Sequence, residues 1–176
     1  MPDLLHLLAF SVVIIAPIVI LVDLIFLIPT IHGAIYYPST DDQIKTMLQL
    51  ARIRRGERAV DIGSGDGRIV RALAKAGADA HGYELNLLLV IWSWWRGLSL
   101  SPKLRGKHHW ANLWFTSFAK YDVVILFGMT YIMKDLETKL LAELQPGAQV
   151  VSNSFPFPNW KPTKRIGRIY LYTKST

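Results

Sequence analysis

The sequence contains no cysteine, which excludes disulfide bonds and metal sites built on thiolates. It contains no Lys or Arg before residue 45, no internal repeat and no low-complexity segment. Its 176 residues are enough for one domain and little more. Charge is also nearly absent from residues 4–31, where Asp23 is the one Asp, Glu, Lys or Arg.

The apolar residues of the chain concentrate in this same segment, LLHLLAFSVVIIAPIVILVDLIFLIPTI. About 20 apolar residues suffice to span a bilayer as a helix, and such a helix tolerates an internal proline like Pro17. The segment is too long for a signal peptide, has no basic residue before it and no small-residue cleavage site after it. We therefore expect one transmembrane helix over 4–31, a linker and N-terminal helix over 32–55 and a domain over 56–176.

The remainder of the chain is basic. It holds all 20 Lys and Arg and 11 of the 13 Asp and Glu, a net charge of +9. Basic residues follow the apolar segment, starting with Lys45, and none precedes it, which predicts a single-pass membrane protein with its domain on the cytoplasmic side. Attraction to anionic lipid head groups explains the charge, so it does not require a nucleic-acid partner.

After residue 40 the sequence alternates between helical and extended patterns. We expect helices over 41–55, 66–76, 86–98 and 133–144, and strands over 58–63, 79–85, 104–113, 121–127 and 148–155, with two further strands meeting near Gly167. Ser39, Thr40 or Asp41 is expected to cap the first helix, and Gly56 to end it. Alternating strands and helices with short connections predict an α/β fold with a parallel sheet between helices.

The stretch AVDIGSGDGRIVRAL, residues 59–73, places a glycine-rich turn between a strand and a helix, where doubly wound sheets bind ligands. A phosphate-binding P-loop needs a lysine that this turn lacks. A dinucleotide fingerprint needs a third glycine where the chain has Arg68. Asp61 and Asp66 would also repel a pyrophosphate. The turn therefore predicts a cationic ligand without phosphate.

S-adenosylmethionine is such a ligand, with an ammonium, a sulfonium and no phosphate. Glycines let the backbone approach it closely, Asp61 can attract the ammonium, and Glu84 at the end of the second strand can accept bonds from the ribose hydroxyls. Asn112 follows the third strand, where the adenine edge would lie. The predicted cofactor site is Asp61, Gly63, Ser64, Gly65, Asp66, Gly67, Glu84, Leu85, Asn112 and Leu113.

Two other groups of residues suggest sites less strongly. His108 and His109 have no third ligand at a suitable spacing, so we expect no metal and assign both to the surface of a strand. For Trp92, Trp94 and Trp95 we expect one in the core and the others at a membrane interface, in preference to a base-stacking platform.

Four segments resemble the small membrane-anchored class I protein-lysine methyltransferases: YYPST (36–40), DIGSGDGRIV (61–70), GYELN (82–86) and LQPGAQVVSNSFPFPNW (144–160). This family includes the mitochondrial enzymes for the ATP synthase c-subunit and the adenine nucleotide translocase, with archaeal and bacterial relatives. The resemblance implies a Rossmann-like, seven-strand methyltransferase sheet, S-adenosylmethionine as donor and lysine side chains as acceptors. Asn112 departs from the aspartate that relatives often carry, and the short segment after SNSF implies a compact, trimmed C-terminal part.

A lysine acceptor must present a neutral amine, which an apolar pocket and a neighbouring cation both favour. Aromatic faces and oxygen atoms can hold it. The candidates are Tyr36, Phe127, Asn153 and Phe155, with Thr130 and Ser154 beside them. The sequence predicts a methyltransferase acting on lysines of a membrane or membrane-associated protein. A methyltransferase for a lipid-soluble small molecule such as a quinone, and a non-catalytic module that binds the cofactor, remain open as alternatives.

Overall fold

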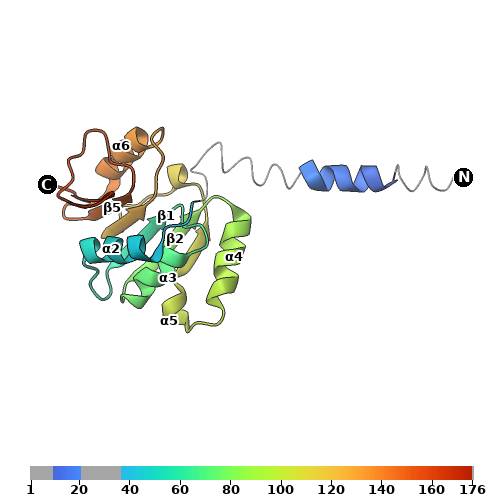
Figure 1. Cartoon of the computed structure of the whole chain (residues 1–176), viewed down its shortest axis with the longest axis horizontal. Helices are drawn as coiled ribbons and strands as arrows, with labels where there is room; N and C mark the ends of the chain where they lie inside the picture. The colour runs from blue at the N-terminus through green and yellow to red at the C-terminus, as the bar shows by residue number, and fades with distance from the viewer. Residues whose placement is uncertain (1–9, 21–36, 176) are drawn as a thin grey trace, which may run out of the picture.

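A seven-stranded sheet organises the domain in the computed structural model, which describes residues 10–20 and 37–175 (Figure 1). The strand order is β3-β2-β1-β4-β5-β7-β6. The strands β1 to β5 are parallel, and β7 runs antiparallel to both β5 and β6. This order is that of the predicted Rossmann-like methyltransferase sheet. The bounds are β1 Arg58–Ile62, β2 Asp79–Glu84, β3 Lys107–Trp110, β4 Val123–Leu126, β5 Gln149–Asn153, β6 Lys164–Ile166 and β7 Ile169–Thr173.

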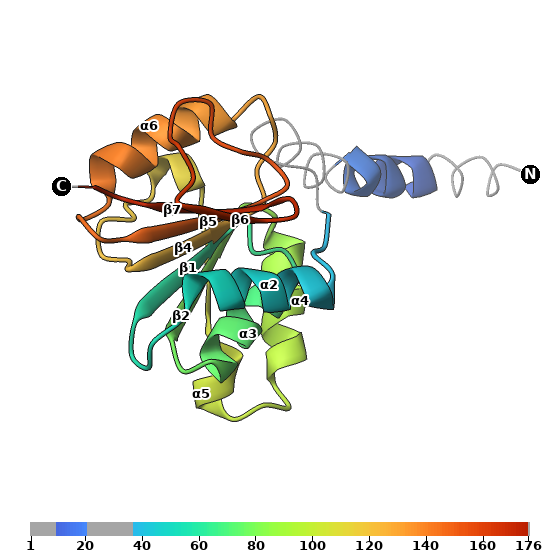
Figure 2. The ribbon, with the colours of Figure 1, turned by 60° about the vertical axis from the view of Figure 1, so that its left-hand side comes forward.

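Helices cover both faces of the sheet (Figure 2). One face carries α2 (Asp41–Ala51), α3 (Arg68–Lys75) and α4 (Leu87–Gly97), and the other carries α6 (Met133–Glu143). The short helix α5 (Pro102–Arg105) and the 3₁₀ helix η1 (Leu113–Phe115) flank β3. The two faces have separate apolar cores, and β4, with the sequence VVIL, contributes buried side chains to both. A strand buried on both faces reads as a continuous apolar run, and this explains why β4 could be predicted.

The helix α2 begins where the sequence indicated and ends earlier. Thr40 and Gln43 form a reciprocal capping box, each side chain accepting the other's backbone N–H, at 3.3 Å and 2.9 Å. The helix ends at Ala51, because Arg52 adopts the left-handed conformation with φ of 48°. The prediction that Gly56 ends the helix is therefore wrong by about one turn.

The C-terminal part is trimmed, as expected. Residues 154–163, between β5 and β6, contain neither a helix nor a strand. The tail returns as the hairpin of β6 and β7, with Gly167 at its turn, which confirms the two strands predicted there.

The apolar N-terminal segment lies largely outside the described residues. Residues 10–20 are helical, and Phe10, Val13 and Ile20 expose more than half of their surface. Among residues 10–20 and 37–175, no helix combines the length and hydropathy that a membrane span requires. The transmembrane helix over 4–31 and the domain boundaries drawn from it stay predictions.

Candidate functional site

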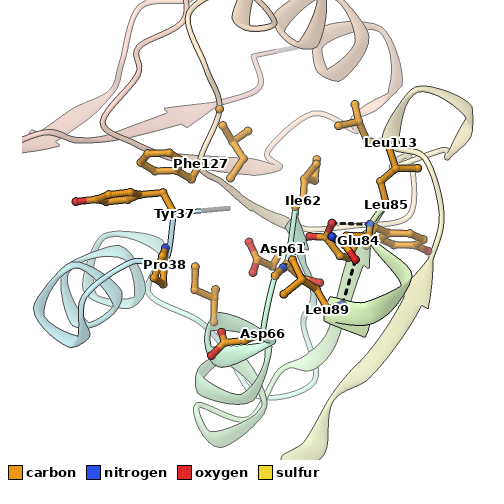
Figure 3. A pocket seen from close by; sticks show the side chains of 18 of the residues that line it. Tyr37, Pro38, Asp61, Ile62, Asp66, Glu84, Leu85, Leu89, Leu113 and Phe127 are labelled. Atoms are coloured by element: carbon orange, nitrogen blue, oxygen red, sulfur yellow. Dashed lines mark hydrogen bonds between the residues drawn. The ribbon is translucent and has the colours of Figure 1, made fainter. Parts of the chain in front are cut away.

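A cavity of about 670 Å³ opens at the carboxyl ends of β1, β2 and β4 (Figure 3). β1 and β4 are neighbours in the sheet, and from them the chain continues in opposite directions, from β1 to β2 and from β4 to β5. The cavity lies at this switch point, which is the usual ligand position in a doubly wound sheet. Residues from the glycine turn, from α4 and from the segment before α2 form its walls. The cavity brings together nine of the ten predicted cofactor residues: Asp61, Gly63, Ser64, Gly65, Asp66, Glu84, Leu85, Asn112 and Leu113.

Gly67 is the predicted cofactor residue that does not line the cavity, and its role is packing. A Cβ atom at this position would lie 1.9 Å from Ser93 Oγ and 2.5 Å from His108 Cε1. Its φ of 74° also belongs to the left-handed region that favours glycine. Gly67 therefore lets α4 and β3 approach the turn closely, rather than admitting a ligand.

Asp61 is the central polar group of the cavity. It is 2% exposed, near the end of β1, and within the described part of the chain no hydrogen bond reaches its carboxyl group. Burial raises the pKa of Asp61 to about 8, and the charges of Glu84 and Asp66 add to the shift. The carboxyl group is consequently protonated at neutral pH, and a cation beside it would favour its ionised form.

Asp66 does not act as the free carboxylate that the sequence suggested. Its oxygens accept hydrogen bonds from Arg68 Nε and from Arg96 Nη1, each at 3.0 Å. Burial alone would raise the pKa of Asp66, but the hydrogen bonds and charge of Arg68, with the charge of Arg71, outweigh it and lower that pKa. Asp66 is thus an ionised structural anchor, and Gly67 occupies the N-cap of α3.

Arg68 and Arg96 are site residues that sequence reasoning missed. Arg68 lines the cavity, and its Nη1 donates to the Ser39 carbonyl oxygen at 3.1 Å, so that it links the segment before α2 to the glycine turn. Arg96 comes from the last turn of α4. Through these two arginines, Asp66 links the glycine turn to the segment before α2 and to α4.

Glu84 lies at the end of β2 and holds two walls of the cavity in place. One carboxylate oxygen accepts the Gly65 N–H at 2.9 Å and the other accepts the Asn86 N–H at 2.8 Å (Figure 3). Asn86 in turn caps α4 by accepting the N–H of Leu88 at 3.0 Å. Each carboxylate oxygen retains a further acceptor position, so Glu84 can also bind the two hydroxyls of a ribose.

Asn112 lines the cavity, but its side chain has a local role as well. Its Oδ1 accepts the Trp114 N–H at 2.9 Å and so caps η1. The amide NH₂ group is the part of the side chain left to donate to a ring nitrogen. Contact of Asn112 and Leu113 with an adenine stays a prediction.

Of the residues predicted to hold a lysine, Phe127 lines the cavity, and Phe155 and Asn153 pack behind its lining residues. Phe127 lines the cavity and stacks on Tyr37, with ring centroids 5.8 Å apart, while Phe155 packs edge-on behind it at 5.5 Å. Asn153 is buried and does not line the cavity; its Nδ2 donates to the hydroxyl of Ser39, a lining residue, at 3.1 Å.

Of the remaining candidates, Tyr36 lies outside the described residues, and the sequence reasoning overlooked its neighbour Tyr37. Thr130 is exposed and does not line the cavity. Ser154 has φ of 70°, and its hydroxyl donates to Asn153 Oδ1 at 3.1 Å. Ser154 does not line the cavity, so its role as a site residue stays a prediction.

The histidines and tryptophans differ from expectation. His108 and His109 are half-buried, not surface residues, and burial lowers the pKa of both imidazoles. His109 stacks on Tyr83, with ring centroids 4.6 Å apart. Among the residues that the structure describes, no three side chains form a metal-binding group. Trp92, Trp94 and Trp95 are 47%, 59% and 59% exposed, so the prediction that one of them lies in the core is wrong.

The sequence is similar to a known protein family and to several characterised proteins. Residues 61–164 match the protein family described as the ANTKMT methyltransferase domain. The ATP synthase c-subunit lysine N-methyltransferase of Xenopus laevis is 46% identical over 132 residues, which cover 75% of this chain and 58% of that protein. The adenine nucleotide translocase lysine N-methyltransferase of Mus musculus is 39% identical over 146 residues, covering 78% and 62% respectively. The chain thus spans about three-fifths of the length of these relatives.

The fold is also similar to that of a solved methyltransferase structure. An RNA methyltransferase from Salinibacter ruber, in complex with S-adenosyl-L-homocysteine, superposes with a TM-score of 0.75 and 26% sequence identity. The superposition covers 79% of this chain and 94% of that one. That protein binds S-adenosyl-L-homocysteine, the product that remains when S-adenosylmethionine loses its methyl group, and it has a similar fold.

Proposed function

The chain belongs to the family of the ANTKMT methyltransferase domain, and from this premise and the geometry of the cavity we propose that it is an S-adenosylmethionine-dependent methyltransferase that modifies lysine side chains. The observation that carries the proposal is the buried carboxyl group of Asp61, which lies beside the glycine turn without a hydrogen-bond partner among the described residues. Such a group has a lower free energy when a cation binds next to it.

The residues of the cavity fit this cofactor. Asp61 provides the counter-charge for an ammonium, and Glu84 provides acceptors for the ribose hydroxyls. The backbone of Gly63 and Gly65 is accessible because neither carries a side chain. When bound, S-adenosylmethionine supplies an electrophilic methyl group on its sulfonium. S-adenosylmethionine carries no phosphate, in agreement with the kind of ligand that the glycine turn predicts.

The wall formed by Tyr37 and Phe127 suits the acceptor amine. Its aromatic surface disfavours the charged form of a lysine, and so lowers the barrier to losing the proton that must leave before transfer. Asn153 acts by positioning, because its hydrogen bond to Ser39 fixes the segment that carries Tyr37 against the end of β5.

The substrate we propose is a protein in or at a membrane. The names of the relatives assign them to lysines of the ATP synthase c-subunit and of the adenine nucleotide translocase. The apolar segment over 4–31, proposed as a single transmembrane helix with the domain on the cytoplasmic side, would confine the enzyme to the surface where such substrates lie.

Transfer of labelled methyl groups tests the proposal. The full-length protein is incubated with donor labelled in its methyl group and with membrane fractions, and the products are hydrolysed to amino acids. We expect label in methyl-lysine, and none with the Asp61→Asn variant. Label in methyl-arginine, label confined to a quinone or another small lipid-soluble molecule, or tight donor binding without any transfer would each contradict the proposal.

A further inference from the structure

The helix α4 turns its large apolar side chains outward and its small side chains toward the sheet. Ser93 and Gly97 are its buried residues, whereas Ile91 is 52% exposed, and Trp94 and Trp95 are 59% exposed. A helix on the surface of a soluble domain usually shows the opposite arrangement. The exposed apolar side chains of the helix and its C-cap, which we call the α4 face, are Leu87, Leu88, Ile91, Trp92, Trp94, Trp95 and Leu98.

This orientation is fixed by contacts at both ends and in the middle of the helix. The Asn86 side chain caps the first turn, and Arg96 in the last turn is paired with Asp66 at 3.0 Å. Between them, the Ser93 hydroxyl packs so closely to Gly67 that a Cβ atom there would overlap it. The helix cannot roll to bury its tryptophans without breaking these contacts.

The α4 face continues onto neighbouring parts of the molecule. Trp110 on β3 is 63% exposed, and its Nε1 donates to the Leu85 carbonyl oxygen at 2.9 Å, which places it next to the first turn of α4. On the other side, Leu88 and Trp92 belong both to the α4 face and to the lining of the cavity. An apolar patch of this extent on a protein surface usually marks a contact with a membrane or a partner.

The charges around the α4 face favour a lipid surface. Residues 85–110 contain Arg96, Lys103, Arg105 and Lys107, and no Asp or Glu. Exposed Trp and Leu side chains on a helix, combined with nearby cations, are typical of helices that lie in the plane of a bilayer interface. We propose that the α4 face inserts into the interfacial region of a bilayer that contains anionic lipids.

The apolar side chains contribute more to this contact than the cations do. Arg96 and Lys107 are already paired, with Asp66 and Asp79, and Arg105 donates to the carbonyl oxygens of Leu98 and Leu100. Lys103 is exposed and has no such partner in the described part of the chain. Binding is therefore expected to depend strongly on the tryptophans and only modestly on the anionic lipid content.

The proposal also agrees with the position of the cavity. Five residues lie between Ile31, the end of the apolar segment, and Tyr37, which lines the cavity, and the six residue-to-residue steps span at most about 20 Å. If residues 4–31 cross the bilayer, the cavity stays near its surface, with Leu88 and Trp92 at the lipid side. This distance limit rests on the proposed function and its membrane anchor, whereas the exposure of the α4 face does not.

Site-specific fluorescent labelling tests the proposal, because the chain has no cysteine of its own. The variants Ile91→Cys, on the α4 face, and Ala142→Cys, an exposed position on α6 across the sheet, each receive an environment-sensitive fluorophore. The full-length proteins are reconstituted into vesicles of phosphatidylcholine and phosphatidylserine without any other protein. We expect a blue shift and quenching by nitroxide-labelled acyl chains at position 91, and neither at position 142.

The outcomes separate this proposal from its alternatives. A fluorophore at position 91 that stays in water, or equal quenching at both positions, would overturn it. So would a blue shift at 91 that requires an added membrane protein, or one that grows with protein concentration at constant lipid, since these indicate a protein partner or a second copy of the chain. Methyl transfer is measured in parallel with the same labelled proteins and with membrane fractions as the source of substrate, so failure of the α4 contact is distinguishable from failure of the proposed activity.

Discussion

Replacing Asp61 with asparagine should stabilise the protein while abolishing donor binding. The pKa of Asp61 in the native protein is about 8, against 3.8 for an unperturbed aspartate. Below pH 4 the carboxyl group is protonated in both the native and the unfolded state, so its full contribution to stability is present. As the pH rises from 4 to 8, only the unfolded chain gains from ionisation, and that contribution is lost.

The size of this effect follows from the difference in pKa. At pH 7 the loss amounts to about 4 kcal/mol, because each unit of pKa difference corresponds to about 1.4 kcal/mol. Asparagine removes this loss but buries an amide that must find its own partners, at a cost of about 2 kcal/mol. We therefore expect a net gain of about 2 kcal/mol at pH 7, or about 5 °C in the unfolding midpoint of a domain of this size.

Urea unfolding of the full-length proteins in detergent, followed by tryptophan fluorescence between pH 5 and pH 8, measures this gain. The stability of the Asp61→Asn variant relative to that of the wild type should rise with pH, from about equal at pH 5 to about 2 kcal/mol greater at pH 7. Asp66→Asn is the matched control, because its pKa is lowered and the substitution removes an ion-paired group, so the variant should be less stable. Superimposable pH profiles for the wild type and Asp61→Asn would refute the reasoning.

Three further substitutions give distinct outcomes. Gly67→Ala introduces a Cβ atom that overlaps the hydroxyl presented by α4, so its unfolding midpoint should fall well below that of Gly56→Ala, a position with a similar φ but with nothing within 4 Å; equal midpoints would contradict the packing role. Glu84→Gln should weaken donor binding about tenfold or more, as titration calorimetry can show, because one of its acceptor oxygens is lost. Arg96→Leu leaves the buried Asp66 with fewer partners and should lower stability by about 1–3 kcal/mol in urea unfolding, whereas an unchanged stability would show that Arg68 alone suffices.

Much of the fold could be predicted because its signals are local in the sequence. The buried strand β4 is a short apolar run, and the glycine turn follows β1 directly. Asp61 and Glu84 were identified because each lies at or near the carboxyl end of a strand, and parallel neighbours bring such positions together.

The parts that could not be predicted depend on contacts between distant segments. Arg96 lies 30 residues from Asp66, and nothing in the spacing indicates that they pair. Asn153 is a polar residue at the carboxyl end of β5, as a ligand-binding residue would be, but its side chain donates to Ser39, 114 residues away. Such pairings are decided by the packing of α4 and α2 on the sheet, not by local pattern.

The orientation of α4 shows a further limit of sequence patterns. LLLVIWSWWRG is apolar around most of its circumference, so hydropathy alone suggests burial and does not say which side faces the sheet. The small residues Ser93 and Gly97 decide this, because close approach to the glycine turn is possible only through them. The same contact leaves the tryptophan side chains on the exposed side of the helix.

The most direct test of lysine methylation is a mass-spectrometric comparison of membrane proteins from cells with and without the gene for this chain. We predict that methyl groups disappear from a defined lysine of a membrane or membrane-associated protein when the gene is absent. Wild-type protein should restore them, and Asp61→Asn should not. Identical lysine methylation in both cells, or restoration by the Asp61→Asn variant, would contradict the account.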